Sequence, residues 1–365
     1  MATSTATNPN RNAWRRLRRN KGAIAGLIVI AAATVVAITC YLIAPDKSPN
    51  ANRMIIEIGG QKPGYTQQFL KLPKEKTFED QSFFAELIYG RDDRHQYIPI
   101  TGYQQTADSI IVQKYIDEGI SERAAYSIAQ LRLTGNEQPV ETITFRLGTD
   151  KYGRDILSRL LVGVRVSLGV GLITVLISLS IGVLLGALAG YYRGWIDDAI
   201  MWFINVLWSI PTLLLVFGIT FVLGKGFWQV FIAIGLTMWV SVARIIRGQI
   251  MSIRELEYVE AARALGFSGS RIIVRHILPN VMGPVLVVAA SNFATAIVIE
   301  AGLSFLGVGV QPPQPSWGLM IKENYNFIIT HNPMLAIAPG IAIMLLVLAF
   351  NLLGNGMRDA IGDVR

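Results

Sequence analysis

The stretch EYVEAARALGFSGSRIIVRHILPN, residues 257–280, lies between two apolar runs that are each long enough to cross a bilayer. Its first part contains good helix formers and no proline, and apolar residues recur at intervals of three up to Leu265. Gly266 follows, and glycine readily adopts the left-handed conformation that ends a helix. The pattern predicts an elbow of two short helices, one over residues 254–265 and a second that begins after Ser268 or Ser270.

The length of this elbow separates it from a membrane span. At 1.5 Å per residue its first arm is under about 20 Å long, whereas the hydrocarbon core needs about 20 apolar residues in helical form. We therefore expect the arm to lie across one face of the membrane. Periodicity alone leaves two interpretations open, a helix resting on lipid headgroups or a helix seated in a groove of another protein.

The whole chain has the composition of an integral membrane protein, with 365 residues of which 52% are hydrophobic and 16% charged. Gly, Ala and Ser are frequent in its apolar runs, which indicates closely packed helices. The first run is interpreted as a retained anchor and not a signal peptide, because no convincing cleavage site precedes Pro45. We predict an all-α polytopic protein with six transmembrane helices, over residues 22–44, 166–191, 200–223, 227–242, 281–299 and 335–353.

The net charge of +8 follows membrane topology, and we expect no nucleic-acid partner. Residues 46–165 carry 16 basic and 16 acidic residues, so the whole excess lies elsewhere. Positive charge beside a span marks the cytoplasmic side. Residues 1–21, the elbow and the C-terminal tail are therefore expected in the cytoplasm, and residues 45–146 outside. Two groups of six basic residues carry this inference: Arg11, Arg15, Arg16, Arg18, Arg19 and Lys21, then Arg244, Arg247, Arg254, Arg263, Arg271 and Arg275.

Residues 45–146 are predicted to form an extracytoplasmic α+β insertion between the first two spans. Apolar residues at helical spacing predict two short helices within residues 106–133, broken near Gly119 and with Ser121 as an N-cap. Residues 52–60 and 141–148 are predicted to be strands or extended edges. His95 is the only histidine of the insertion, and no catalytic or metal-binding constellation accompanies it.

The ordered residues of the elbow favour a docking helix. EAARALG at 260–266, followed by HILPN at 276–280, resembles the EAA loop of permease subunits of ATP-binding-cassette (ABC) importers. In that family the loop forms the coupling helix that docks on a separate ATPase subunit. His276 departs from the family, which usually has isoleucine there. The resemblance implies these ATPase-coupling residues: Tyr258, Val259, Glu260, Ala261, Ala262, Arg263, Leu265, Gly266, Arg271, His276 and Pro279.

Two further stretches, LGTDKYGRDILSRLLVGVRVSL at 147–168 and GLSFLGVGVQPPQPSWGLMI at 302–321, are similar to the second permease subunit of dipeptide, oligopeptide and nickel importers. The resemblance implies a type I ABC importer permease fold over residues 147–365, with the coupling loop at 254–280. It also singles out an outer-interface signature for which a structural helix or contact with a binding protein stays open: Asp150, Gly153, Arg154, Asp155 and Arg159.

The residues of these two stretches carry local expectations of their own. Thr149 or Asp150 is expected to cap a short helix, and Asp155 to pair with Arg159 at i,i+4. Trp317 suits the aromatic belt at the lipid headgroups.

The source of energy is predicted to lie outside the chain. Glu300 and Arg165 fall at the ends of predicted spans and are interpreted as interfacial, so the titratable midplane groups of a secondary carrier or channel are missing. The sequence has no GxxxxGK[ST] loop for nucleotide phosphates. His95, His276 and His331 fall in separate regions and no HExxH occurs, which speaks against a membrane enzyme.

The expected function is therefore that of a transporter subunit without catalytic residues, metal ligands or a cofactor of its own. The resemblance implies a homologous permease, two ABC ATPase subunits that bind ATP and Mg, and an extracytoplasmic solute-binding protein as partners, besides membrane lipid. It places the chain in the bacterial inner membrane with both termini in the cytoplasm. Peptides are the expected cargo. Nickel or another small solute, and an ATP-independent carrier or channel, are the alternatives.

Polar residues within the spans are candidates for a translocation path. Each of them can instead serve as a hydrogen bond between helices, a common role of polar side chains in membrane bundles. The candidates are Asn205, Ser209, Ser291, Asn292, Thr295 and Asn351.

Overall fold

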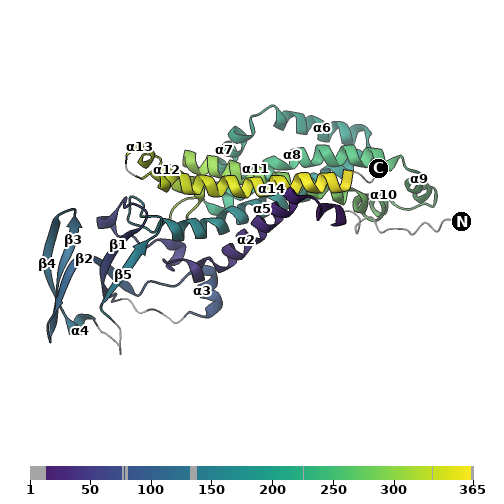
Figure 1. Ribbon diagram of the computed structural model, residues 1–365. Coiled ribbons are helices and arrows are strands. Elements are labelled where there is room, and N and C mark those ends of the chain that lie inside the picture. The colour runs from purple at the N-terminus through teal and green to yellow at the C-terminus, as the bar shows by residue number, and fades with distance from the viewer. Residues whose placement is uncertain are drawn as a thin grey trace. The chain divides into compact units, whose positions relative to one another are not determined.

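The computed structural model of the chain describes residues 14–75, 78, 81–131, 138–224, 226–330 and 332–362 (Figure 1). Arg11 in the predicted basic N-terminus, His331 and residues 363–365 of the predicted cytoplasmic tail lie outside this part. Two compact units divide the chain, one of residues 1–33, 167–311 and 343–365 and the other of residues 34–166 and 312–342. We call the first the helical unit and the second the sheet unit.

Five helical stretches among the described residues are long and apolar enough to cross a membrane. They are α2 (Lys21–Ile43), α5 (Ile156–Tyr192), α8 (Phe227–Arg254), the continuous stretch Gly269–Leu306 that contains α10 and α11, and α14 (Met334–Gly362). The prediction of a polytopic helical protein is confirmed.

α8 continues 12 residues beyond the predicted end of its span at residue 242. The guanidinium of Arg244 lies over the ring of Trp208, 3.7 Å from its centroid. Arg247 donates to both carboxylate oxygens of Asp197, over 2.5 and 2.6 Å. Because these charged groups have partners on a neighbouring helix, the helix need not end where its hydropathy falls.

The predicted third span is wrong as a single straight helix. Residues 200–223 belong to α6 (Gly194–Trp208) and α7 (Thr212–Leu223), which are bent against each other by 93°. Pro211 lies at the bend, and proline disfavours helical backbone in the residue before it. α7 has 12 residues and is about 18 Å long, so it is too short to cross alone. A sixth span exists only if the bent pair is taken as one.

α5 and α8 pack through main chain. Gly182, Gly186 and Gly190 recur every four residues on α5, and we call these three residues the glycine ladder. A Cβ added at any of them would come within 2.8 Å of a carbonyl oxygen of α8. α2 and α14 approach as closely, since a Cβ on Gly26 would lie 2.4 Å from the carbonyl oxygen of Ala349. The close packing predicted from small residues is confirmed.

The sheet unit contains a five-stranded antiparallel sheet in the order β4-β3-β2-β1-β5 (Figure 1). Its strands are β1 (Tyr65–Pro73), β2 (His95–Gln105), β3 (Ser109–Asp117), β4 (Ile120–Ser127) and β5 (Val140–Phe145). The strand predicted within 141–148 is confirmed as β5, whereas residues 52–60 contain the short 3₁₀ helix η2 (Ile56–Ile58). Two further short helices, α3 (Phe83–Tyr89) and α4 (Ile128–Leu131), complete the insertion.

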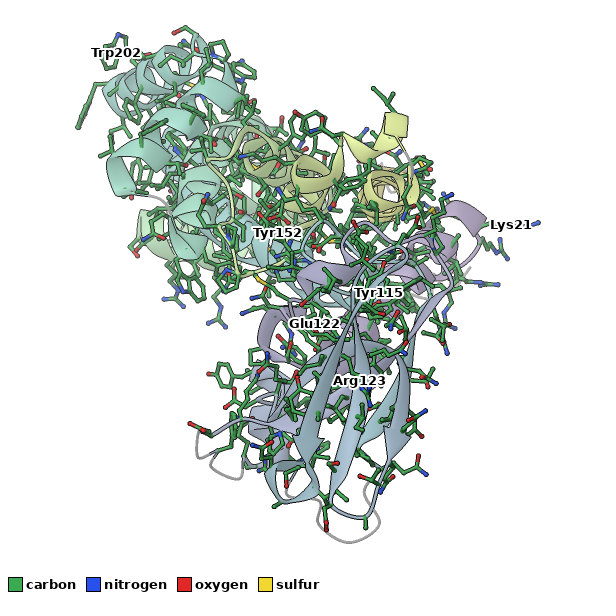
Figure 2. All side chains as sticks on the ribbon, turned by 90° about the vertical axis from the view of Figure 1, so that its left-hand side faces the viewer. Lys21, Tyr115, Glu122, Arg123, Tyr152 and Trp202 are labelled. Atoms are coloured by element: carbon green, nitrogen blue, oxygen red, sulfur yellow. The ribbon has the colours of Figure 1, made fainter. Side chains whose placement is uncertain are left out.

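The two helices predicted within residues 106–133 are wrong, because β3 and β4 form a hairpin there. Ile110 and Val112 are fully buried in the core of the sheet, at the period of two that a strand requires. Gly119, with φ +78°, lies in the turn that was expected to break a helix. Glu122 and Arg123 label the edge strand β4 in Figure 2, and their charges protect that edge from further pairing.

Candidate functional site

The first arm of the elbow is α9 (Glu257–Ala264), and it ends as its sequence predicts. Gly266 has φ +78°. Its N–H donates to the carbonyl of Arg263 over 3.0 Å, and the next N–H, from Phe267, reaches back to Ala262 over 3.2 Å. This pair of bonds is the Schellman motif, which satisfies carbonyls that a helix end leaves free. The predicted glycine stop is confirmed.

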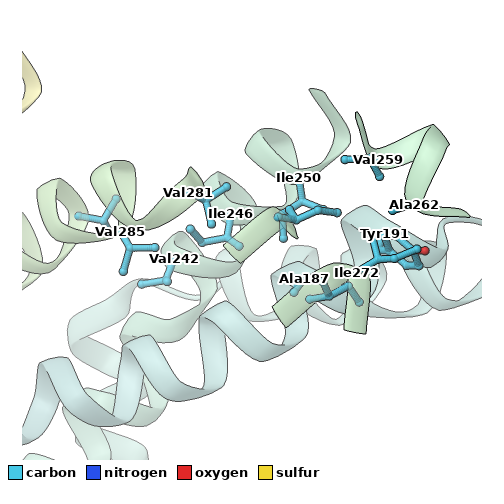
Figure 3. Packing of buried hydrophobic residues seen from close by; sticks show 13 residues of the cluster. Ala187, Tyr191, Val242, Ile246, Ile250, Val259, Ala262, Ile272, Val281 and Val285 are labelled. Atoms are coloured by element: carbon cyan, nitrogen blue, oxygen red, sulfur yellow. The ribbon is translucent and has the colours of Figure 1, made fainter. Parts of the chain in front are cut away.

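α9 is fixed to the helical unit by two side chains (Figure 3). Val259 is fully buried and Ala262 is 4% exposed. Both belong to one apolar cluster with residues of α5, α8, α10 and α11, among them Tyr191, Ile246, Ile250, Ile272, Ile277 and Val281. Ala262 was expected to let a partner approach closely, which is wrong because it faces inward. Of the two alanines only Ala261 is exposed for that role.

The other face of α9 is free of this packing. Tyr258, Glu260, Ala261, Arg263 and Leu265 are exposed, and Leu265 retains 73% of its surface. Glu257 and Glu260 lie in the first helical turn and Arg263 in the last, an arrangement that the helix dipole favours. The exposed surface therefore combines an acidic first turn with apolar side chains.

The second arm and the following span form one stretch. α10 (Gly269–Ile272) continues through a π-helical turn at Ile273–Ile277 into α11 (Leu278–Leu306), which together give the 38-residue stretch Gly269–Leu306. The expectation that Pro279 interrupts the chain before the span is wrong. Pro279 occupies the first turn of α11, where the missing N–H costs nothing. A displacement of the second arm therefore reaches the span directly.

Aromatic and polar contacts close the elbow. Phe267 stacks on His276 with 5.9 Å between ring centroids, and the Arg271 guanidinium lies 4.3 Å from the Phe267 centroid. The side-chain amide of Asn280 donates to the hydroxyl of Tyr258 over 3.0 Å and to the carbonyl of His276 over 2.8 Å. All eleven predicted coupling residues thus lie in one elbow. Asn280 was not among them, because its role depends on the folded proximity of α9 and α11.

Two of the six path candidates line a cavity of about 270 Å³ in the helical unit. They are Asn292 and Thr295 on α11, and the side-chain amide nitrogen of Asn292 is buried without a hydrogen-bond partner among the described residues. Polar side chains of α7 and α8 that the sequence did not single out share this cavity, namely Thr212, Thr237 and Ser241.

The other four candidates do not line this cavity. The amide oxygen of Asn205 accepts from Arg244 over 2.9 Å, and the Ser209 hydroxyl donates to the carbonyl of Val206 over 2.7 Å. Ser291 and Asn351 are exposed on α11 and α14.

Glu300 was interpreted as interfacial, which is wrong. α11 runs past the predicted end of the span at residue 299, so Glu300 lies within the helix and is 1% exposed. Its carboxylate accepts from the hydroxyl of Ser304 over 2.6 Å.

The predicted outer-interface signature forms a buried ionic cluster in the sheet unit. Arg154 donates to Asp150 and to Glu323 of α12 (Trp317–Asn324), both over 2.6 Å. Arg159 lies 3.6 Å from Glu323 and 3.9 Å from Asp150. We call these four residues the Arg154 cluster. Glu323 was not predicted, because 169 residues separate it from Arg154.

Gly153 allows the turn of this signature to form. It has φ +71°, and a Cβ there would lie 1.7 Å from the carbonyl oxygen of Ile55. Asp150 accepts the N–H groups of Tyr152 and Arg154 over 2.9 and 3.0 Å, so it stabilises the turn and does not cap a helix.

Two other expectations for the signature stretches are wrong. Asp155 does not pair with Arg159; it accepts from the N–H of Ser158 over 2.8 Å and from the Ser158 hydroxyl, so it caps α5. Burial raises the pKa of Asp155, and the hydrogen bonds from Ser158 oppose that rise. Trp317 does not belong to a headgroup belt, since it is 3% exposed and its indole N–H donates to the carbonyl of Leu160 over 3.1 Å.

Two protein families match this chain. Residues 182–363 match the family described as binding-protein-dependent transport system inner membrane component. Residues 8–62 match the N-terminal TM domain of oligopeptide transport permease C. Most of the insertion, including the whole sheet, falls between the two matched ranges.

Similar proteins include the glutathione transport system permease protein GsiD of Pectobacterium atrosepticum, 43% identical over 215 residues that cover 59% of this chain and 71% of the relative. The dipeptide transport system permease protein DppC of Alkalihalophilus pseudofirmus is 42% identical over 214 residues, 59% and 70% of the two chains. An inward-facing structure of the MetNI methionine ABC transporter aligns with a TM-score of 0.47 and 20% identity, over 57% of this chain and 98% of that one. By its matches to these permeases the chain belongs to the inner membrane components of binding-protein-dependent transport systems.

Proposed function

We propose that this chain is one of two permease subunits of an ATP-driven importer of peptides, and that α9 is the element that docks on a separate ATPase. The observation that carries the proposal is the two-sided character of α9. Val259 and Ala262 fix it to three membrane helices, while Glu260, Ala261 and Leu265 face outward. Peptide cargo is supported by the names of the relatives, which are transporters of glutathione and dipeptides.

The mechanism follows from this packing. When the ATPase subunits close, they displace α9, and its buried cluster passes the displacement to α5, α8 and the α10–α11 stretch. A permease with two such states gives alternating access. The cavity lined by Asn292 and Thr295 lies against two of these helices, and we assign it to the translocation path. Four more polar candidates, Asn205, Ser209, Ser291 and Asn351, keep a role at the second permease or the helix contacts.

The proposal includes the topology and the partners. The basic residues beside the spans support a cytoplasmic elbow, cytoplasmic termini and an extracytoplasmic insertion at 45–146. ATP and Mg bind to two ATPase subunits, and a solute-binding protein delivers the cargo. The Arg154 cluster is buried, so its role is to hold the outer ends of the spans in place.

Reconstituted uptake tests this function. The chain, purified with its co-purifying partners and placed in proteoliposomes, is expected to accumulate a radiolabelled dipeptide or glutathione only when ATP is supplied. Accumulation of radioactive nickel in place of peptide would overturn the cargo. Uptake by the isolated chain without nucleotide would overturn the proposed energy source.

The cytoplasmic position of the elbow predicts one-sided labelling of a cysteine. Ser268 is exposed at the elbow, and the native Cys40 is fully buried and can be replaced by alanine. In the Cys40→Ala background, Ser268→Cys is expected to react with a membrane-impermeant thiol reagent in inverted vesicles and not in intact cells or spheroplasts. Ile120→Cys on the sheet is the matched control and should show the opposite pattern. Reaction of Ser268→Cys in spheroplasts would contradict the topology.

A further inference from the structure

The short helix α3 in the insertion is amphipathic and leaves its apolar side exposed. Phe83, Phe84, Leu87 and Ile88 share one helical face by their spacing. Phe83, Phe84 and Ile88 retain 60%, 73% and 52% of their surface. Single exposed apolar residues are ordinary on a protein surface, but three on one helical face call for a partner.

The ends of α3 are well defined. The hydroxyl of Ser82 accepts the N–H of Ala85 over 3.3 Å, which caps the first turn. Gly90 ends the helix with φ +81°, and its N–H donates to the carbonyl of Glu86 over 3.0 Å. The exposed apolar face therefore belongs to a formed helix.

Arg165 of α5 fixes α3 to the end of the first span. It donates to the carbonyls of Leu87 and Ile88 over 2.9 and 2.6 Å, at the helix end where carbonyls lack partners. Its third bond, over 3.0 Å, goes to the carbonyl of Ala37 in α2. Arg165 was interpreted from the sequence as a residue at the membrane interface, and these bonds give it a structural task there.

The C-terminal end of α3 also packs against the exit of α2. A Cβ on Gly90 would lie 2.9 Å from the ring of Tyr41 and 2.8 Å from the carbonyl oxygen of Lys47. The next N–H, from Arg91, donates to the same carbonyl over 2.7 Å. α3 is thus held at the point where the chain leaves the first span.

That point has a definite depth in the membrane. α2 has 23 residues, which make about 35 Å of helix and match a hydrocarbon core of about 30 Å. Ala37 and Tyr41 lie in its last two turns. The same end of α2 presents further exposed apolar side chains, which face lipid in a membrane span: Val35, Ile38, Leu42 and Ile43. The apolar face of α3 is attached to the helix whose lipid-facing surface these residues form.

We propose that α3 lies in the headgroup region of the bilayer and inserts Phe83, Phe84 and Ile88 among the upper acyl chains. The occupant of this surface is membrane lipid, because the helix is bonded to the lipid-facing end of a span and carries aromatic side chains suited to that depth. α3 then anchors the insertion to the membrane surface, a role separate from transport.

Collision accessibility of a nitroxide tests this position. The label is placed at Phe84→Cys in the Cys40→Ala background, in the complete transporter reconstituted into lipid vesicles. Collisions with oxygen are expected to exceed collisions with a water-soluble nickel chelate, giving a ratio several-fold above that at Ile120→Cys. Tyr89→Cys, exposed on the opposite side of α3, is the matched control on the same helix and should show a lower ratio than Phe84→Cys.

Two results would overturn the proposal. A ratio at Phe84→Cys equal to that at Ile120→Cys would mean that the helix lies in water. An immobilised label that neither reagent reaches would mean that a protein covers it. Phe83→Cys repeats the measurement at a second site, in case the label at Phe84 disturbs the helix.

A substitution at Arg165 tests the attachment itself. Arg165→Lys retains the charge but cannot make the three guanidinium bonds to two helices. The oxygen-to-nickel ratio at Phe84→Cys is expected to fall toward that at Ile120→Cys, while the complex stays monodisperse. An unchanged ratio would refute the role of Arg165.

Discussion

ATP-driven uptake is expected to be abolished in the Gly266→Pro variant, although the protein still inserts and binds its permease partner. Gly266 has φ +78°, whereas proline fixes φ near −65°. The substitution also removes the N–H that donates to Arg263. Proline at an incompatible position costs about 3 kcal/mol or more, so the elbow must rearrange. The uptake rate in proteoliposomes and the amount of co-purified ATPase measure the effect.

Matched variants separate this effect from general damage. Gly266→Asn should retain most uptake, because asparagine tolerates the left-handed conformation. Glu260→Lys should lower uptake about tenfold, which corresponds to about 1.4 kcal/mol of lost docking free energy. Glu257→Lys makes the same charge change in the same helical turn and should have a much smaller effect. Normal uptake in both Gly266→Pro and Glu260→Lys would show that the elbow does not couple the subunits.

Arg154→Ala is expected to destabilise the protein by about 3–5 kcal/mol, the usual cost of removing one partner from a buried ion pair. Arg154 is 1% exposed, and without it the carboxylates of Asp150 and Glu323 stay buried without their closest cation. The thermal unfolding midpoint of the purified complex in detergent checks this.

Two comparisons make the Arg154 prediction specific. Arg154→Lys should lie between the wild type and Arg154→Ala, because lysine keeps the charge but cannot contact both carboxylates with a planar fork. Arg146→Ala removes an exposed arginine nearby and should change stability by no more than about 0.5 kcal/mol. Equal midpoints for Arg154→Ala and Arg146→Ala would show that the Arg154 cluster does not stabilise the fold.

Hydropathy predicted where the spans begin better than where they end. The predicted fourth span ends before Arg244 and Arg247, but the helix continues because both guanidinium groups find partners on α6. A composition window cannot detect such partners. The 93° bend at Pro211 was missed for a related reason, since the flanking residues are apolar on both sides.

The insertion shows how ambiguous short apolar runs are. In β3 the apolar residues at 110–112 and 115–116 satisfy a helical period as well as a strand period. The sequence favours the strand through its adjacent β-branched residues and a Gly in a two-residue turn, and those signals deserved more weight. Burial of Ile110 and Val112 against the sheet then decides between the two periods.

The elbow was largely predictable because its chemistry is local. A glycine that needs positive φ and an apolar residue every third position can be read from neighbouring letters. The bond from Asn280 to Tyr258 and the sharing of Glu323 by two arginines depend on residues that meet only in the folded chain. The cavity residues on α7 and α8 were missed for the same reason.

The glycine ladder has a consequence for how force crosses the membrane. Contacts between long side chains yield, because rotamers can change under load, but carbonyl oxygens that touch the opposing α carbons have no such freedom. α5 and α8 therefore shift as a single stiff lever. A push delivered at the cytoplasmic end arrives at the bilayer centre undiminished.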